Sequence, residues 1–389
     1  MKNFRSIYVL LLLILLVTSC WSDRNEEETS VYESILPLDS TVEIDGLSQY
    51  VDSLEIIPII NNAGVSLNII SKMLVTENNF IVLASGSVFS LTKDGKTVKQ
   101  YGESGRGPGE YHSVFDICLD NSEEEVWCLC YSFPPKIQKY DLVSHILIEE
   151  IEIEPLIDAT GIIPLKNGGF MLYVPNPDYN DHANSEKDFY CLKIFDRNGL
   201  YKGEKLKQKD FNLNAAFFRP VSQSSGNRYV LAPGSSSESC LIYENGELMK
   251  RINFDFGDKT LPAGFAFQGV NNPWENIGVI FSLDYYKYVS SIYFLDNGVF
   301  FTAHGKQSSV WHFFKGGSSG IRWRSIGKLT PPMRAVGADD TYVYFICYDY
   351  GEIPLKEELD PLKRYVIQTK RFPCENEVSI IIKVKFRVE

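Results

Sequence analysis

Residues 77–95, Glu77-Asn78-Asn79-Phe80-Ile81-Val82-Leu83-Ala84-Ser85-Gly86-Ser87-Val88-Phe89-Ser90-Leu91-Thr92-Lys93-Asp94-Gly95, contain two short apolar runs framed by turns. The runs are residues 80–84 and 88–91, and the framing turns are rich in Asn, Asp and Gly. Apolar runs of this length between turn residues are typical of β-strands. A short connection between two such runs predicts a hairpin.

Both kinds of turn recur in alternation along the chain, which indicates internal repeats. The first kind precedes an aromatic or β-branched strand and lies at residues 77–79, 121–123, 166–169, 225–227, 296–298 and 338–340. The second kind follows the next strand and lies at residues 93–95, 142–144, 196–199, 244–246 and 315–317. If the strands are called A to D, each unit is A, first turn, B, loop, C, second turn, D. This is the four-stranded blade of a β-propeller.

The sixth unit ends with the strand at residues 378–386 and has no D strand after it. An unpartnered strand at residues 54–60 precedes the first complete unit, and we expect it to fill that place, because closure removes exposed sheet edges. The prediction is an all-β protein, a six-bladed β-propeller of four-stranded antiparallel blades over residues 45–389. A short helical insert at residues 352–365 would be its one exception.

The N-terminus has the features of a bacterial lipoprotein signal peptide. Lys2 and Arg5 precede an apolar run at residues 7–17, and Cys20 closes the sequence Leu16-Val17-Thr18-Ser19-Cys20. A basic start, a short apolar run and small residues before the cleavage point are typical of a secretory signal. The run is too short to cross a bilayer, which needs about 20 residues. We therefore expect residues 1–19 to be removed and Cys20 to carry the acyl anchor.

Residues 20–44 begin with a polar, acidic stretch that has no periodic apolar face. Such a composition predicts a flexible tether. Short acidic stretches behind a lipidated cysteine also resemble the signals that carry lipoproteins to the outer face of the outer membrane in some Gram-negative bacteria. An ordinary linker is the alternative, so the periplasmic side and the cell surface both stay open.

The charge balance and the cysteine content argue against several kinds of partner and against a disulfide framework. The chain has 38 basic and 50 acidic side chains and a net charge of −12. This balance argues against nucleic acid as a partner and against electrostatic docking on anionic lipid. The 8 cysteines show no tight spacing, so those other than Cys20 are expected to be small buried hydrophobes. A bond between Cys118 and Cys128 is the alternative left open.

The most specific local motif is the glycine-rich run at residues 101–111. A strand follows it where a dinucleotide or phosphate loop would need a helix. We expect a loop that crosses the propeller towards its channel, with glycines that allow positive φ. Arg106, Glu110 and Tyr111 are candidate ligand contacts within it.

Gly105-Arg106-Gly107-Pro108-Gly109-Glu110-Tyr111, after a blade that ends in Lys93-Asp94-Gly95-Lys96, resembles the six-bladed β-propeller lipoproteins of Gram-negative outer membranes. Those proteins are related in pattern to the NHL-repeat and TolB-like propellers. The resemblance covers nearly the whole mature chain and implies the fold and the outer membrane location. It implies no particular activity, because one fold hosts many functions.

Long connections mark one face of the predicted propeller, at residues 175–188, 205–214, 257–284 and 349–364. Loops of this length in a compact domain are usually functional or disordered. Aromatic faces beside amides and carboxylates suit sugars or peptides. The candidate ligand-binding residues are Arg106, Glu110, Tyr111, Tyr179, Asp181, His182, Trp274 and Tyr350.

Two functions follow from these features. The first is a non-enzymatic binding module for a glycan, peptide or protein partner, held at the outer membrane through Cys20, with no cofactor. The alternative is a metal-dependent lyase or lactonase-like hydrolase with its ion near the channel, on His112, His182 and His304. Nothing in their spacing shows that these histidines converge. The sequence has no Gly-x-Ser-x-Gly elbow, and we assign no catalytic residue.

Overall fold

The two strands predicted from residues 77–95 form a hairpin. β5 (Asn79–Ala84) pairs antiparallel with β6 (Ser87–Thr92), with Phe80 opposite Leu91 and Ala84 opposite Ser87. The two residues between the strands, Ser85 and Gly86, both have positive φ, at 48° and 80°. Such a turn matches the twist of paired strands.

The computed structural model describes residues 32–38, 41–43, 50–60, 67, 69–154, 158–175, 189–208, 220–224, 227–233, 239–260, 285–286, 288–304, 309–315, 319–323, 333–347 and 380–387. Met1–Tyr32 is a unit separate from Glu33–Glu389, and the fold below is that of the second unit. In the described segments, regular structure consists of strands and one 3-10 turn, η3 (Gly257–Lys259). None of these segments contains a helix with the length and apolarity of a membrane span.

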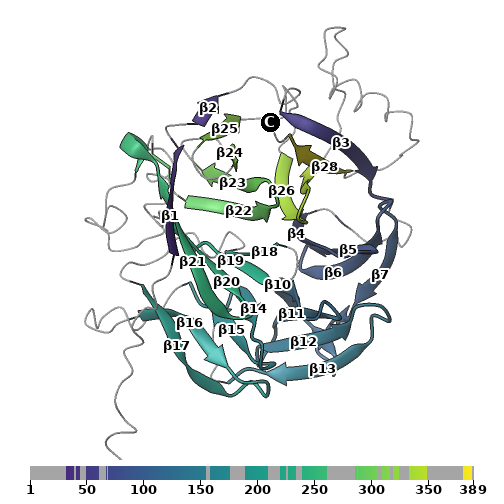
Figure 1. Ribbon diagram of the computed structural model, residues 1–389. Helices are drawn as coiled ribbons and strands as arrows, with labels where there is room; N and C mark the ends of the chain where they lie inside the picture. Colours follow the sequence, from purple (N-terminus) through teal and green to yellow (C-terminus); the bar gives the residue numbers. More distant parts are fainter. Residues whose placement is uncertain are drawn as a thin grey trace, which may run out of the picture. The chain divides into compact units, whose positions relative to one another are not determined.

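The first three blades are four-stranded antiparallel sheets in chain order (Figure 1). Blade 1 consists of β4 (Ile70–Val75), β5, β6 and β7 (Thr97–Tyr101). Blade 2 consists of β10 (Ser113–Leu119), β11 (Glu125–Tyr131), β12 (Lys136–Asp141) and β13 (Leu147–Glu152). Blade 3 consists of β14 (Gly161–Pro164), β15 (Phe170–Tyr173), β16 (Phe189–Phe195) and β17 (Tyr201–Gln208). Between blades 1 and 2, β8 (Glu103–Ser104) and β9 (Glu110–Tyr111) form a short parallel pair.

The next two blades each have a fifth strand. Blade 4 consists of β18 (Val221–Gln223), β19 (Arg228–Leu231), β20 (Ser239–Glu244) and β21 (Glu247–Asp255), with β1 (Tyr32–Pro37) beside β21. Blade 5 consists of β22 (Tyr288–Leu295), β23 (Gly298–His304), β24 (Ser309–Lys315) and β25 (Ser319–Trp323), with β2 (Thr41–Glu43) parallel to β25.

Blade 6 joins the two ends of the propeller. It consists of β26 (Met333–Ala338), β27 (Val343–Cys347), β28 (Ile380–Phe386) and β3 (Val51–Pro58). β28 pairs antiparallel with β3, with Ile382 opposite Ile56 and Val384 opposite Leu54. The predicted closure by a strand from the N-terminal side of blade 1 is therefore confirmed.

Six inner strands surround the centre of the fold, and each contacts the next around a closed ring: β4, β10, β14, β18, β22 and β26. Apolar clusters fill the spaces between neighbouring blades, for example Ile57 and Ile381 of blade 6 against Phe80 and Val82 of blade 1. The all-β six-bladed prediction is thus confirmed. The helical insert expected at residues 352–365 lies outside the described residues.

One segment differs from its prediction. Residues 20–44 were expected to form a tether, yet β1 and β2 lie within them. Leu36 and Leu38 are buried at 3% and 1% exposure in the core of blades 4 and 5. β1 pairs with the open edge of β21. Because β21 is distant in the sequence, the composition of the polar stretch by itself does not indicate this pairing.

The described cysteines of blades 2, 3 and 4 are buried, as the sequence predicted. Cys118, Cys128, Cys130, Cys191 and Cys240 are buried free thiols. Cys118 lies opposite Trp127, and Cys128 lies opposite Ile117, so the alternative Cys118–Cys128 bond is not formed. Burial raises the pKa of the Cys240 thiol to about 12, which keeps it protonated.

Candidate functional site

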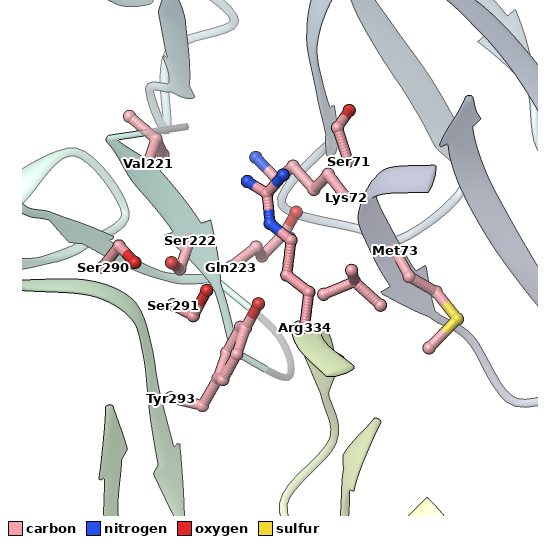
Figure 2. A pocket seen from close by; sticks show the side chains of 11 residues that line it. Ser71, Lys72, Met73, Val221, Ser222, Gln223, Ser290, Ser291, Tyr293 and Arg334 are labelled. Carbon is pink, nitrogen blue, oxygen red and sulfur yellow. The ribbon is translucent and has the colours of Figure 1, made fainter. Parts of the chain in front are cut away.

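A small pocket lies among the inner strands of blades 1, 4, 5 and 6 (Figure 2). Its lining combines hydroxyl, amide, cationic and apolar side chains from Ser71, Lys72, Met73, Val221, Ser222, Gln223, Ser290, Ser291, Tyr293, Arg334 and Val336. The space has room for about one water-sized group.

The pocket lies at the end of the channel where the inner strands begin. Ser71, Ser222 and Arg334 are each the second residue of their strands, β4, β18 and β26. The connections from one blade to the next enter the inner strands at this end. It is also the end at which the sequence places the long connections.

Backbone irregularities aim several of these side chains. The pairing register shifts between Ile70 and Lys72 in β4, between Ser290 and Tyr293 in β22, and between Ala335 and Gly337 in β26. A bulge of this kind turns the following side chains relative to the sheet.

Ser291, inside the β22 irregularity, has a left-handed φ of 51°. Its hydroxyl donates to the carbonyl oxygen of Ala335 at 3.0 Å, a bond that joins blade 5 to blade 6. Left-handed conformation in a non-glycine residue is unfavourable by about 1–3 kcal/mol and recurs at functional sites.

A buried ion pair forms one side of the site. Lys72 Nζ and Asp116 Oδ1 are 2.8 Å apart, and their side chains are 5% and 0% exposed. Asp116 Oδ2 also accepts a hydrogen bond from the Ile162 backbone N–H at 3.1 Å. The carboxylate therefore links the inner strands of blades 1, 2 and 3, and it neutralises the buried ammonium.

Arg334 is the second cation of the pocket. Its guanidinium points into the space near Lys72 and Gln223 (Figure 2). In the described part of the chain, it makes no hydrogen bond or ion pair. Its positive charge contributes to the lowered pKa of His304, after burial, so its field reaches the neighbouring blade.

The remaining polar groups of the pocket are neutral. Ser290 Oγ and His304 Nε2 share a hydrogen bond of 2.7 Å. Burial lowers the pKa of His304 to about 3, so the imidazole is neutral at pH 7. Gln223 Oε1 accepts from the Leu119 N–H at 2.9 Å, and its amide nitrogen lies 3.3 Å from the Tyr229 hydroxyl.

The glycine-rich loop binds its own carboxylate. Glu110 Oε2 accepts a hydrogen bond of 2.6 Å from the Gly107 N–H. A Cβ at Gly105 would lie 1.9 Å from the same oxygen. The loop thus surrounds the Glu110 side chain. The carboxylate, which was predicted to contact a ligand, is instead hydrogen-bonded to the backbone of its own loop. Arg106 lies exposed on the same loop.

Tyr111 has a different place from the one predicted. It is fully buried at 0% exposure, and its hydroxyl donates to the Tyr101 carbonyl oxygen at 3.0 Å. It belongs to the core between blades 1 and 2. An aromatic ring beside a glycine-rich loop suggested a ligand contact. In the structure the ring instead buries its apolar area in the core.

Of the three histidines predicted for the metal alternative, the structure describes His112 and His304 and places them in different blades. His112 is exposed at the start of blade 2, and His304 ends β23 of blade 5. Over the described ranges, no group of three His, Cys, Asp or Glu side chains could hold a metal ion. His182 and the other predicted ligand contacts, Tyr179, Asp181, Trp274 and Tyr350, lie outside the described residues.

Sequence reasoning missed the inner-strand residues of the pocket. These residues lie in runs that the sequence identified only as the A strands of blades, with no functional role. They are Lys72, Ser222, Ser290 and Arg334. The available signal was charge, because a lysine or arginine in an otherwise apolar inner strand is rarely buried without a reason.

Comparisons with known proteins agree on the fold. A family model described as 6-bladed beta-propeller matches residues 23–309. A solved structure of a protein described as exported, from Bacteroides fragilis, is similar with a TM-score of 0.67 at 13% identity, covering 91% of this chain and 99% of that chain. At this identity the similarity concerns the fold alone.

Two further structures are more distant. A protein of unknown function from Bacteroides caccae has a TM-score of 0.41 at 11% identity and covers 69% of this chain and 85% of that chain. A PQQ-bound aldose sugar dehydrogenase from Streptomyces coelicolor has a TM-score of 0.44 at 10% identity and covers 86% and 100%. No curated protein matches the chain.

Proposed function

The chain belongs to the 6-bladed beta-propeller family, and we propose that it is a binding module of the cell envelope that captures a glycan, peptide or protein at the end of its channel. The observation that carries the proposal is the convergence of cationic, hydroxyl and amide groups from four blades on one pocket. Polar groups that converge in this way fix the orientation of a ligand and give specificity.

The pocket favours recognition of a projecting chemical group. Its room for about one water-sized group is too small for a whole sugar ring or peptide residue. A larger ligand would place a single group in the pocket and the rest of its surface outside, over the end where blade-to-blade connections meet. Such a division suits capture of an end or a side group of a polymer.

The cell-envelope part of the proposal comes from Cys20 and the signal-like residues before it. We propose that Cys20 carries the acyl anchor and that the outer membrane holds the propeller, on its periplasmic or outer side. Support comes from the fold shared with a protein described as exported. The metal-dependent alternative is not carried further, since no observation favours it.

The anchor is tested with Cys20→Ser in the native bacterium, with Ser22→Ala as the control. Wild type and Ser22→Ala are expected in the membrane fraction and labelled by a clickable fatty acid, and Cys20→Ser is expected to lose the label. Labelling that survives Cys20→Ser contradicts the anchor. Protease treatment of intact cells then separates the two sides of the membrane, because only a surface protein is cleaved.

The binding role is tested by filling the pocket. We expect arrays of envelope glycans and peptides to yield ligands for the wild type that Ser222→Phe no longer binds, because the ring is larger than the pocket and would exclude the projecting group of a ligand. Ser144→Phe is the control, since Ser144 is exposed on a turn at the other end of blade 2. Equal melting temperatures establish that both variants fold. Ligands retained by Ser222→Phe would place binding elsewhere.

A further inference from the structure

The charged residues of the six inner strands form a very small set. β14, β18 and β22 contain none, and the others contain Lys72, Asp116 and Arg334, one in each strand. In a protein with a net charge of −12, these six described strands therefore carry two cations against one anion.

One of the two cations is already neutralised. Lys72 and Asp116 are nearly inaccessible and 2.8 Å apart. The carboxylate's other oxygen is also occupied, by the Ile162 N–H at 3.1 Å. Because both oxygens of Asp116 are used by Lys72 and the backbone, the inner strands leave the charge of Arg334 without a counter-charge.

Among the described residues, the surroundings of Arg334 supply no negative group. His304 is neutral at pH 7, and the pocket's serines and Gln223 are uncharged. Burial keeps the pKa of Tyr293 above its ordinary value, so the phenol is also neutral. Ser222 is 8% exposed and, in the described structure, its hydroxyl makes no hydrogen bond, so it can donate into the pocket.

We propose that Arg334, with the Ser222 hydroxyl, binds a carboxylate group of the captured ligand, an inference that rests on the proposed function. The guanidinium offers N–H donors in a planar fork that matches the two oxygens of a carboxylate. A single carboxylate balances the single positive charge. A carboxylate is smaller than a phosphate, and a dianion would bring an excess charge to a pocket where the described residues supply one cation outside the Lys72–Asp116 pair.

Carboxylates occur on peptide ends and acidic residues and on acidic sugars, and the probes separate these sources. The full-length protein is titrated by calorimetry at low salt with N-acetylglycine and with its neutral amide, and with glucuronate and with glucose. Inorganic phosphate is the competing anion. We expect at least one carboxylate to bind and its neutral counterpart to bind more weakly by about tenfold or more.

The matched variants are Arg334→Gln and Arg228→Gln. Arg228 is exposed at the start of β19, outside the pocket, so its change leaves binding unaffected. Arg334→Gln is expected to weaken carboxylate binding by about tenfold or more, because it removes the charge and the fork. If Arg334→Gln does not fold, Arg334→Lys keeps the charge without the fork and is expected to weaken binding by a smaller factor.

Three results would overturn the inference: a neutral counterpart binding as well as its acid, phosphate binding in preference to both acids, or carboxylate binding that Arg334→Gln leaves unchanged. These results differ from failure of the proposed function. If array ligands depend on the pocket but not on a carboxylate, the binding role stands and the carboxylate assignment falls. If Ser222→Phe affects no ligand, the channel site itself is wrong.

Discussion

At the scale of single residues, the channel places charge where a propeller core is otherwise apolar. The Lys72–Asp116 pair is nearly sealed from water, so each partner depends on the other for compensation. We predict that Lys72→Met lowers the free energy of unfolding by about 3–5 kcal/mol, because it leaves a buried carboxylate without its cation. Urea denaturation measures this loss.

The double variant Lys72→Met/Asp116→Asn is the control for that prediction. The asparagine oxygen can still accept from the Ile162 N–H, while the charge is gone. The double variant is expected to be more stable than Lys72→Met alone. If it is equally unstable or worse, the loss comes from packing and the charge argument fails.

His312 gives a second prediction at this scale. Its ring is 0% exposed, stacks on Phe301 at a centroid distance of 5.0 Å, and has no hydrogen-bond partner for either nitrogen within the described structure. Burial, and to a lesser extent the charge of Arg322, lowers its pKa to about 3. The native state therefore prefers the neutral ring, while the unfolded chain takes up the proton below about pH 6.5.

The free energy of unfolding therefore has its full value above about pH 6.5 and decreases as the pH falls towards 3. Each such histidine lowers it by about 2 kcal/mol between pH 7 and pH 5. His304, with a pKa of about 3, adds a similar amount. Urea midpoints at pH 7 and pH 5 measure the slope. His312→Phe is expected to reduce it, and an unchanged slope would exclude His312 as a source.

At the scale of elements, glycines in the turns between strands C and D allow one blade to touch the next. Gly95 has φ of 85°, and a Cβ there would lie 2.1 Å from the carbonyl oxygen of Pro58, on the outer strand of blade 6. Gly199 has φ of 79° and the same relation to Glu152 on the outer strand of blade 2, at 2.2 Å. The repeat of this contact explains why a glycine recurs in these turns.

We predict that Gly95→Ala destabilises the protein by about 1–3 kcal/mol more than Gly168→Ala. Gly168 has nearly the same φ, 81°, but its Cβ would meet nothing closer than 3.8 Å. The two variants therefore share the backbone strain of alanine at positive φ and differ in the contact between blades. Thermal denaturation compares them. Equal losses would mean that strain alone explains the glycine.

Strands inside the blades were predictable because their signals are local. Turn residues with apolar runs between them located β5, β11 and β27 to within a few residues. β1 and β2 lack that signal, because their place depends on the unpaired edges of β21 and β25. Tyr111 shows the same limit for a side chain, since its burial depends on Tyr101 and Tyr140 from other strands.

At the scale of the whole molecule, the chain closes its ring with β3 and adds β1 and β2 to the outside of blades 4 and 5. β3 and β1 have different structural roles. β3 supplies the outer strand of blade 6 and covers the edge of β28. β1 adds Leu36 and nearby Leu38 to a core that strands of blades 4 and 5 already form.

We therefore predict unequal effects of two truncations. Deleting residues 21–43 should lower the melting temperature, since the burial of Leu36 and Leu38 is worth about 1.5–3 kcal/mol each, yet leave a monomer with one cooperative transition. Deleting residues 21–58 also removes β3 and should cause aggregation through the exposed β28 edge. Size-exclusion chromatography and thermal denaturation measure both. A folded monomer after the longer deletion would contradict closure by β3.

The sequence alone determined the repeat, the number of blades and the closing strand, because turn chemistry and strand patterning act between residues close in the chain. The tertiary structure decided the candidate site. Lys72, Ser222, Ser290 and Arg334 come from four blades and are far apart in sequence. Their meeting depends on ring closure and on bulges in the inner strands, and both arise from pairing between distant segments.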